Sequence, residues 1–275
     1  MKKYGFRQSN SDHTLFLKHN SDRVTCLILY VDDMIITGND ENEINKLTKG
    51  LFTEFEMKSL GNLKYFLRIE VMRSQQGIFI CQKKYILDLL AEIGMIDCKP
   101  SETPMTMNQK LFIEDGAKSA DKERYQRIVG QLMYLLHTRP DIAYVVGVVS
   151  QIMHDPQEAH MNAVLSIIRY LKRTLGHEVL FRSNGHLKIQ VYTDADWARD
   201  KGNRRSTSRY FSVVGGNLVT LMSKTQKVVT LSSAEAELRT KGLTEALCIK
   251  KLMFEVGFSQ KKAPSYPDFR KSCST

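Results

Sequence analysis

The chain has 275 residues, of which 42% are hydrophobic and 25% are charged, and its formal net charge is +10. This length suits two domains or one large domain, and the positive charge favours a polyanionic partner, either nucleic acid or an anionic membrane surface. No apolar run approaches the roughly 20 residues of a membrane span, and residues 1–8 lack the apolar segment of a signal peptide, so we expect a soluble intracellular protein, cytoplasmic or nuclear.

Strands are predicted first along the chain. The β-prone segments are residues 14–17, 24–31 and 34–37. The last two are so close together that they predict a hairpin with Asp32 and Asp33 at its tip. A helix is predicted next, because Asp40 can cap it and apolar residues recur at helical spacing from Ile44 to Phe55.

A second hairpin and a short helix follow. Residues 65–71 and 78–81 predict the two strands, which residues 74–77 would connect. Residues 84–93 then predict a helix. The stretch 98–118 is rich in proline, methionine and polar residues and has no sustained period, so it predicts a linker.

The second half of the chain begins with helices and continues with strands. Helices are predicted over residues 121–137, 140–154 and 158–175, and strands over residues 187–193, 210–214 and 217–222. The second helix opens with a proline in the favoured first turn, and the apolar faces of all three imply a small helical subdomain. A long helix is predicted from Ser232 to Val256. Residues 259–275 are rich in lysine, serine and proline and are expected to be irregular.

The adjacent carboxylates of Asp32 and Asp33 need an explanation. Two such groups on a rigid hairpin repel each other unless a cation lies beside them. A magnesium site for phosphoryl transfer has this character, because Mg²⁺ takes one or two carboxylates and keeps several waters. The alternative is a solvated acidic turn, which is the commoner origin of a bare acidic pair.

The sequence around this pair shifts the balance toward a metal site. Tyr30-Val31-Asp32-Asp33 resembles the YxDD box of reverse transcriptases, and the continuation MIITGND is similar to the copia-type retrotransposon branch. Further blocks of the same resemblance are KYFL at residues 64–67, IEV at 69–71, YQRIVG at 125–130 and HTRPDIAY at 137–144. With the motifs described below, the resemblance extends to about residue 258.

The resemblance implies a palm with three catalytic carboxylates, two from this box and one from an earlier strand. Few residues precede Tyr30, and Asp12 and Asp22 lie in polar, turn-like settings. We therefore expect the third carboxylate and the fingers not to be part of this chain. Arg68 stands where the family usually has glycine, a departure that is expected to disturb close packing.

A second group of acids follows the helical region. YTDADWA at residues 192–198, RRSTS at 204–208 and LSSAEAE at 231–237 resemble the copia-type ribonuclease H domain. Ser232 and Glu235 form a capping box, so Glu235 has a structural role. Glu237 has no such role, although an i,i+4 pair with Lys241 is an alternative. We assign Asp194 and Glu237 to metal binding, with Asp196 as a lesser candidate.

This second site is expected to be incomplete. The resemblance implies further aspartates on a strand and on a segment after the last helix. Residues 263–270 instead contain two prolines, which argue against a central strand, and Asp268 lies in no recognisable motif.

The remaining candidate residues are basic residues, histidines and cysteines. Arg169, Lys172 and Arg173 are as consistent with a solvated helix face as with binding. Nucleic acid is the better explanation for the basic cluster after the second acidic motif, because arginines and adjoining hydroxyls contact phosphate. Its members are Arg199, Lys201, Arg204, Arg205, Arg209 and the hydroxyl residues Ser206, Thr207 and Ser208. His137 and His160 lack metal-like spacing, and the five scattered cysteines predict reduced thiols.

The predicted fold is α+β: a partial reverse-transcriptase palm (residues 1–96), a linker (97–120), a helical thumb or connection (121–176), a truncated ribonuclease H-like domain (177–258) and an irregular tail. The resemblance implies that the parent polyprotein catalyses RNA-directed DNA synthesis and cleavage of RNA in RNA–DNA hybrids. In this chain, the Mg²⁺ or Mn²⁺ sites are expected to be weak or partial. RNA, DNA or an RNA–DNA hybrid would be the partner. We expect the isolated chain to perform neither reaction.

Two alternatives remain open at this point. One is a non-enzymatic, basic nucleic-acid-binding remnant, for which binding would survive removal of all four candidate carboxylates. The other is a polypeptide that is only a gene-model artefact of a decayed element.

Overall fold

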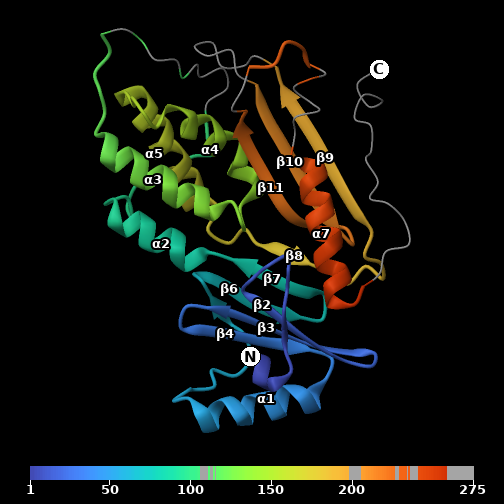
Figure 1. The fold of residues 1–275 in the computed structure, drawn as a ribbon. Coiled ribbons are helices and arrows are strands. Elements are labelled where there is room, and N and C mark those ends of the chain that lie inside the picture. The colour runs from blue at the N-terminus through green and yellow to red at the C-terminus, as the bar shows by residue number, and fades with distance from the viewer. Residues whose placement is uncertain are drawn as a thin grey trace.

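The computed structural model describes residues 1–105, 111, 114, 116–197, 206–226, 229–233, 235 and 241–258. Three antiparallel sheets and a group of helices make up this part of the chain (Figure 1). The mixed α+β class predicted from the sequence is therefore confirmed. No helix in the described ranges is long and apolar enough to cross a membrane.

The first sheet has the order β1-β2-β3-β4. Its strands are β1 (Arg7–Gln8), β2 (Leu15–Asn20), β3 (Arg23–Tyr30) and β4 (Asp33–Gly38), and a short 3₁₀ helix, η1 (Lys2–Tyr4), precedes them. Helix α1 (Glu41–Glu54) covers one face, where Leu47 and Leu51 pack against Phe6 and Leu27. Asp40 caps α1 as predicted, but the helix ends at Glu54 and the C-cap Phe55 is exposed.

The second sheet has the order β5-β6-β7-β8. Its strands are β5 (Tyr65–Phe66), β6 (Ile69–Ser74), β7 (Gly77–Cys81) and β8 (Val179–Phe181). The predicted turn at residues 74–77 is confirmed by the pairing of Ser74 with Gly77. The single strand predicted over residues 65–71 is wrong, because Leu67 and Arg68 form a tight turn at φ 48° and 62°. Strand β8 was not predicted, and it joins this sheet from beyond the helices.

The helical region contains the largest hydrophobic core. It consists of α2 (Lys83–Glu92), α3 (Lys122–Leu135), α4 (Ala143–Val149) and α5 (Glu158–Arg173), with 3₁₀ turns η2 (Pro140–Ile142) and η3 (Ser150–Ile152) on either side of α4. The helix predicted over residues 140–154 is thus three short pieces. Pro140 occupies the first turn of η2, as expected.

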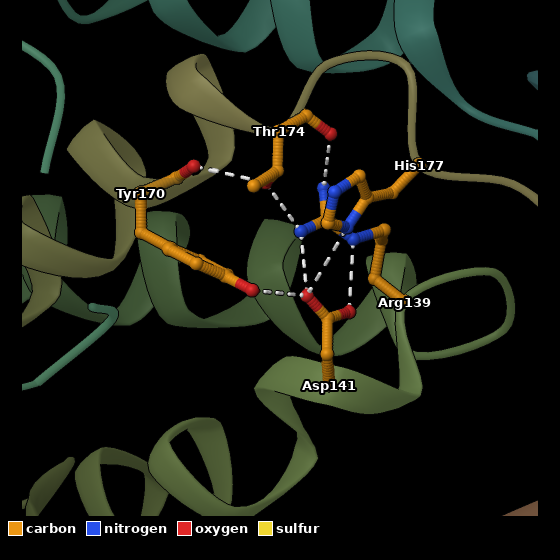
Figure 2. A network of polar contacts seen from close by, with 5 residues as sticks. All are labelled: Arg139, Asp141, Tyr170, Thr174 and His177. Carbon is orange, nitrogen blue, oxygen red and sulfur yellow. Dashed lines mark hydrogen bonds and ion pairs between the residues drawn. The ribbon is translucent and has the colours of Figure 1, made fainter. Parts of the chain in front are cut away.

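A network around the buried Arg139 side chain fixes the corner between α3 and α4 (Figure 2). The guanidinium of Arg139, which is 1% exposed, donates to the Asp141 carboxylate at 2.9 and 2.7 Å. It also donates to the carbonyl oxygen and the hydroxyl of Thr174 at 3.1 and 2.6 Å, and the Tyr170 hydroxyl donates to Asp141 at 2.8 Å. The TRPD segment therefore joins this corner to the end of α5.

The third sheet has the order β11-β10-β9. Its strands are β9 (Ile189–Asp196), β10 (Thr207–Val214) and β11 (Asn217–Thr225), and helix α7 (Gly242–Val256) packs across it through Ala246 and Ile249. The prediction of one helix from Ser232 is wrong, because Lys241 lies in a turn and is the N-cap of α7.

Helix α7 also contacts the first sheet. Leu252 and Val256 pack against Leu15, Leu17 and Cys26, on the face that α1 does not cover. Figure 1 shows α7 extending from the third sheet toward this N-terminal layer. The C-terminal helix therefore holds two sheets together that are far apart in sequence.

Candidate functional site

The YVDD segment forms the tight end of the β3–β4 hairpin. Tyr30 pairs with Asp33, so Val31 and Asp32 are the two loop residues. The predicted hairpin is confirmed, with one correction: only Asp32 lies in the loop, because Asp33 is the first residue of β4. Adjacent residues of a tight turn and strand are held at fixed positions, so the hairpin presents both carboxylates from a rigid support.

Val31 has an unusual backbone conformation. Its φ is 50°, whereas Asp32 has a negative φ, and this pattern fits a type II′ turn, where glycine is favoured at the first loop position. A β-branched residue at positive φ is a genuine outlier. Such strain costs about 1–3 kcal/mol and gathers at functional sites. Because Val31 is 89% exposed, no burial of its side chain compensates for the strain.

The carboxylates of Asp32 and Asp33 are open to solvent. Within the described ranges, neither carboxylate forms a hydrogen bond or an ion pair. Open carboxylate oxygens suit a hard cation such as Mg²⁺, so this pair fits two ligands of such an ion. The described residues nevertheless contain no group of three or more His, Cys, Asp or Glu side chains that could hold a metal.

The hairpin is connected to the second sheet through aromatic contacts. The Tyr30 ring meets Phe66 of β5 edge-on, with ring centroids 6.4 Å apart. Beside it, the Tyr134 hydroxyl donates to the carbonyl of Leu67. The Arg68 guanidinium lies 5.3 Å from the centroid of the Tyr85 ring. Arg68 is exposed and has a left-handed backbone with φ 62°, a conformation that costs a residue with a Cβ atom more than it costs glycine.

The second acidic group lies on β9. Asp194 and Asp196 both face Arg209 of β10, which pairs directly with Asp194 in the sheet register. The Arg209 guanidinium reaches Asp196 at 2.6 Å and Asp194 at 3.4 Å, and it lies 5.3 Å from the centroid of the Tyr144 ring. The two carboxylates thus already share a cation. This donor set does not fit a divalent metal as it stands.

Residues 1–107 match a family model described as reverse transcriptase (RNA-dependent DNA polymerase). The chain is 39% identical over 220 residues to an uncharacterised mitochondrial protein of Arabidopsis thaliana, covering 80% of this chain and 91% of that protein. It is 40% identical over 262 residues to the retrovirus-related Pol polyprotein from transposon RE1 of the same plant, covering 94% of this chain. The chain belongs to the copia-type retrotransposon reverse transcriptase family.

This copia-type chain is also 36% identical to the retrovirus-related Pol polyprotein from transposon TNT 1-94 of Nicotiana tabacum, and the match covers 98% of this chain. It spans only 18% of the RE1 polyprotein and 21% of the TNT 1-94 polyprotein. No solved structure matches it.

Several predicted site residues of the copia-type chain lie outside the described residues. These are Glu237, Arg199, Arg204 and Arg205, which remain predictions. Ser206 is fully buried, and its hydroxyl shares a 2.8 Å hydrogen bond with Thr230, so the structure does not place it on a nucleic-acid surface. One half of the predicted capping box is confirmed, since the Ser232 hydroxyl accepts from the Glu235 amide at 3.2 Å. The Glu235 carboxylate accepts from Leu231 rather than from Ser232.

Two side-chain pairs were not predicted from the sequence. The Arg139–Asp141 pair was visible only as part of the HTRPDIAY block, where nothing local indicated that both side chains would turn toward α5. The pairing of Arg209 with Asp194 could have been found, because antiparallel pairing of two consecutive strands brings such positions together. That inference required the ends of both strands, which periodicity alone does not fix.

Proposed function

We propose that this chain is the C-terminal part of a reverse-transcriptase palm followed by a helical connection and a ribonuclease H-like domain. The observation that carries the proposal is the strained YVDD hairpin, which presents Asp32 and Asp33 to solvent without a basic partner among the described residues. In this proposal, the two carboxylates hold Mg²⁺ close to a primer end. The ion, when bound, would stabilise the attacking and leaving oxygens of nucleotide transfer.

The edge of the first sheet supports this assignment. Within the described residues, β4 pairs only with β3, so a strand from elsewhere in a polyprotein can pair with β4 and bring a third carboxylate near Asp33. A polymerase site without that group holds its cation weakly and does not position the incoming nucleotide. Since positioning carries much of such catalysis, we propose that the chain by itself binds nucleic acid without extending a primer.

The ribonuclease H-like assignment is supported by the order of elements. Three consecutive antiparallel strands, β9 to β11, precede a helix that packs on the sheet, and Asp194 lies near the end of the first strand. Glu237 would be the matching acid on the segment before α7. We propose that this domain contributes to binding of the duplex and does not hydrolyse it.

A mapping experiment tests the polymerase assignment. The probe is a labelled RNA–DNA hybrid with a recessed DNA 3′ end, to which the chain is bound in the presence of Fe²⁺, ascorbate and peroxide. An Fe²⁺ ion held by Asp32 and Asp33 should cut the nucleic acid within a few nucleotides of the recessed end. The control is the Asp32→Asn, Asp33→Asn double variant, in which the local cuts should disappear while binding persists. Cuts that persist unchanged in this variant would refute the assignment.

Activity assays test the proposed lack of catalysis. Neither primer extension nor hydrolysis of the RNA strand should exceed the level of the double variant, with either Mg²⁺ or Mn²⁺. Extension by the parent chain above this background would show that the missing ligand is supplied from within the chain. Hydrolysis that depends on Glu237, measured with Glu237→Gln, would show that the second site is complete.

A further inference from the structure

The ion-pair cluster on β9 and β10 has a feature that its family resemblance does not explain. A pair of carboxylates intended for a divalent ion should leave its oxygens open, as Asp32 and Asp33 do. Asp194 and Asp196 instead share the guanidinium of Arg209, which contacts one oxygen of each. A positive charge therefore already lies where the two carboxylates converge.

The position of Arg209 is fixed from several sides. Its backbone is paired with that of Asp194 across the sheet, in the middle of a ladder that runs from Thr207 to Val214. The guanidinium also lies over the Tyr144 ring from α4, and a cation over an aromatic face is attracted by it. The Arg209 side chain is only 28% exposed. These restraints reduce the entropy that a free arginine would lose on pairing, so the ion pair persists better than one between two mobile surface chains.

We propose that Arg209 takes the place of a divalent cation at Asp194 and Asp196 and so excludes metal from this site. The physical reason is charge: with the guanidinium in contact, the two carboxylates carry one net negative charge instead of two. An incoming Mg²⁺ or Mn²⁺ must displace Arg209 or approach against its repulsion. The inference deepens the proposed ribonuclease H-like assignment, because it gives that domain a built-in reason for lacking hydrolysis.

The test measures metal binding alone, so its outcome does not depend on whether the chain binds or cleaves nucleic acid. All proteins carry Asp32→Asn and Asp33→Asn, which removes the other candidate site, and this double variant is the reference chain. Free Mn²⁺ is followed by electron paramagnetic resonance during titration of the full chain. The informative variant is Arg209→Gln, and its matched control is Arg209→Lys, which keeps the positive charge.

The reference chain and Arg209→Lys should bind no Mn²⁺ that depends on Asp194 and Asp196. Arg209→Gln should gain one Mn²⁺ site at Asp194 and Asp196. Its affinity should exceed that of the reference chain at the same position by on the order of tenfold or more, since a unit charge at contact distance has been removed. Adding Asp194→Asn and Asp196→Asn to Arg209→Gln should abolish the gain. An unchanged affinity in Arg209→Gln, with circular dichroism equal to that of the reference chain, would overturn the proposal.

A second comparison covers the case in which Arg209→Gln does not fold. Asp194→Asn and Asp196→Asn are introduced into the reference chain with Arg209 intact. If Arg209 excludes metal, this change leaves Mn²⁺ binding unaltered. A loss of bound Mn²⁺ would mean that the carboxylates hold metal despite Arg209, and the proposal would be wrong.

Discussion

The hydroxyl of Ser9 donates a hydrogen bond to the carboxylate of Glu255, across 246 positions of the sequence. Both side chains are buried. The Glu255 carbonyl also bonds the His19 ring at 2.8 Å, so the end of α7 is attached to the N-terminal loop and to β2. Burial alone would raise the pKa of Glu255, but the bonds from Ser9 and from the amides of Ser11 and Asn10 outweigh it and hold the pKa below its ordinary value.

Removal of this carboxylate should loosen α7 from the first sheet. We expect Glu255→Ala to lower the free energy of unfolding by about 1–3 kcal/mol, because the Ser9 hydroxyl and nearby amides lose a charged acceptor. Urea denaturation followed by circular dichroism measures the change. Leu247→Ala, on the exposed face of the same helix, is the control and should cost much less. Equal effects of the two substitutions would contradict a specific role for Glu255.

The pH dependence of stability should reflect the Arg139–Asp141 pair. Partial burial raises the pKa of Asp141, but hydrogen bonds from Arg139 and its charge outweigh burial and lower that pKa below its ordinary 3.8. A carboxyl with a depressed folded-state pKa stabilises the fold above its ordinary pKa and loses this contribution as the pH falls through the folded value. The stabilisation should therefore be complete at neutral pH and decline below about pH 4.

Asp141→Asn isolates this contribution. The parent chain should exceed the variant in unfolding free energy near neutral pH, where the buried Arg139 loses its counter-charge in the variant. The difference should shrink as the pH falls below 3.8. Denaturant unfolding of both proteins across this range provides the measurement, and a constant difference at every pH would argue against the ion pair as its source.

The Leu67–Arg68 turn should be more stable with glycine at its second position. Arg68→Gly relieves the left-handed backbone but loses the contact with Tyr85, whereas Arg68→Ala loses the contact and keeps the strain. We expect the glycine variant to be more stable than the alanine variant by about 1 kcal/mol. Thermal and urea unfolding of the pair test this order. A more stable alanine variant would mean that the turn does not strain its residue.

The start of α7 should tolerate no side chain at Gly242. A Cβ atom there would lie 2.2 Å from Cγ2 of Thr193, next to Asp194. Gly242→Ala should therefore lower the unfolding free energy by about 1–3 kcal/mol, the usual cost of overpacking. Gly130→Ala is the matched control, because nothing lies within 4 Å of its added methyl group and alanine favours a helix. This control should be neutral or stabilising.

The sequence predicted local structure well where short-range chemistry decides it. The β3–β4 hairpin and the Asp40 cap of α1 lie where the β-prone segments and the capping residue indicated. The family, too, was visible in the YVDD box and the blocks after it. These features depend on residues that are neighbours in the chain, so a linear pattern contains the information.

Tertiary structure decided the relationships between distant residues. Periodicity did not indicate that residues 179–181 would form a strand and pair with β7, or that the last helix would begin at Gly242 beside Thr193. The same holds for the carboxylates. Motif and spacing made Asp32 and Asp194 equivalent candidates for metal, but the fold leaves one open and places Arg209 against the other. A carboxylate's chemistry depends on the charge and solvent around it, and the packing of distant strands supplies both.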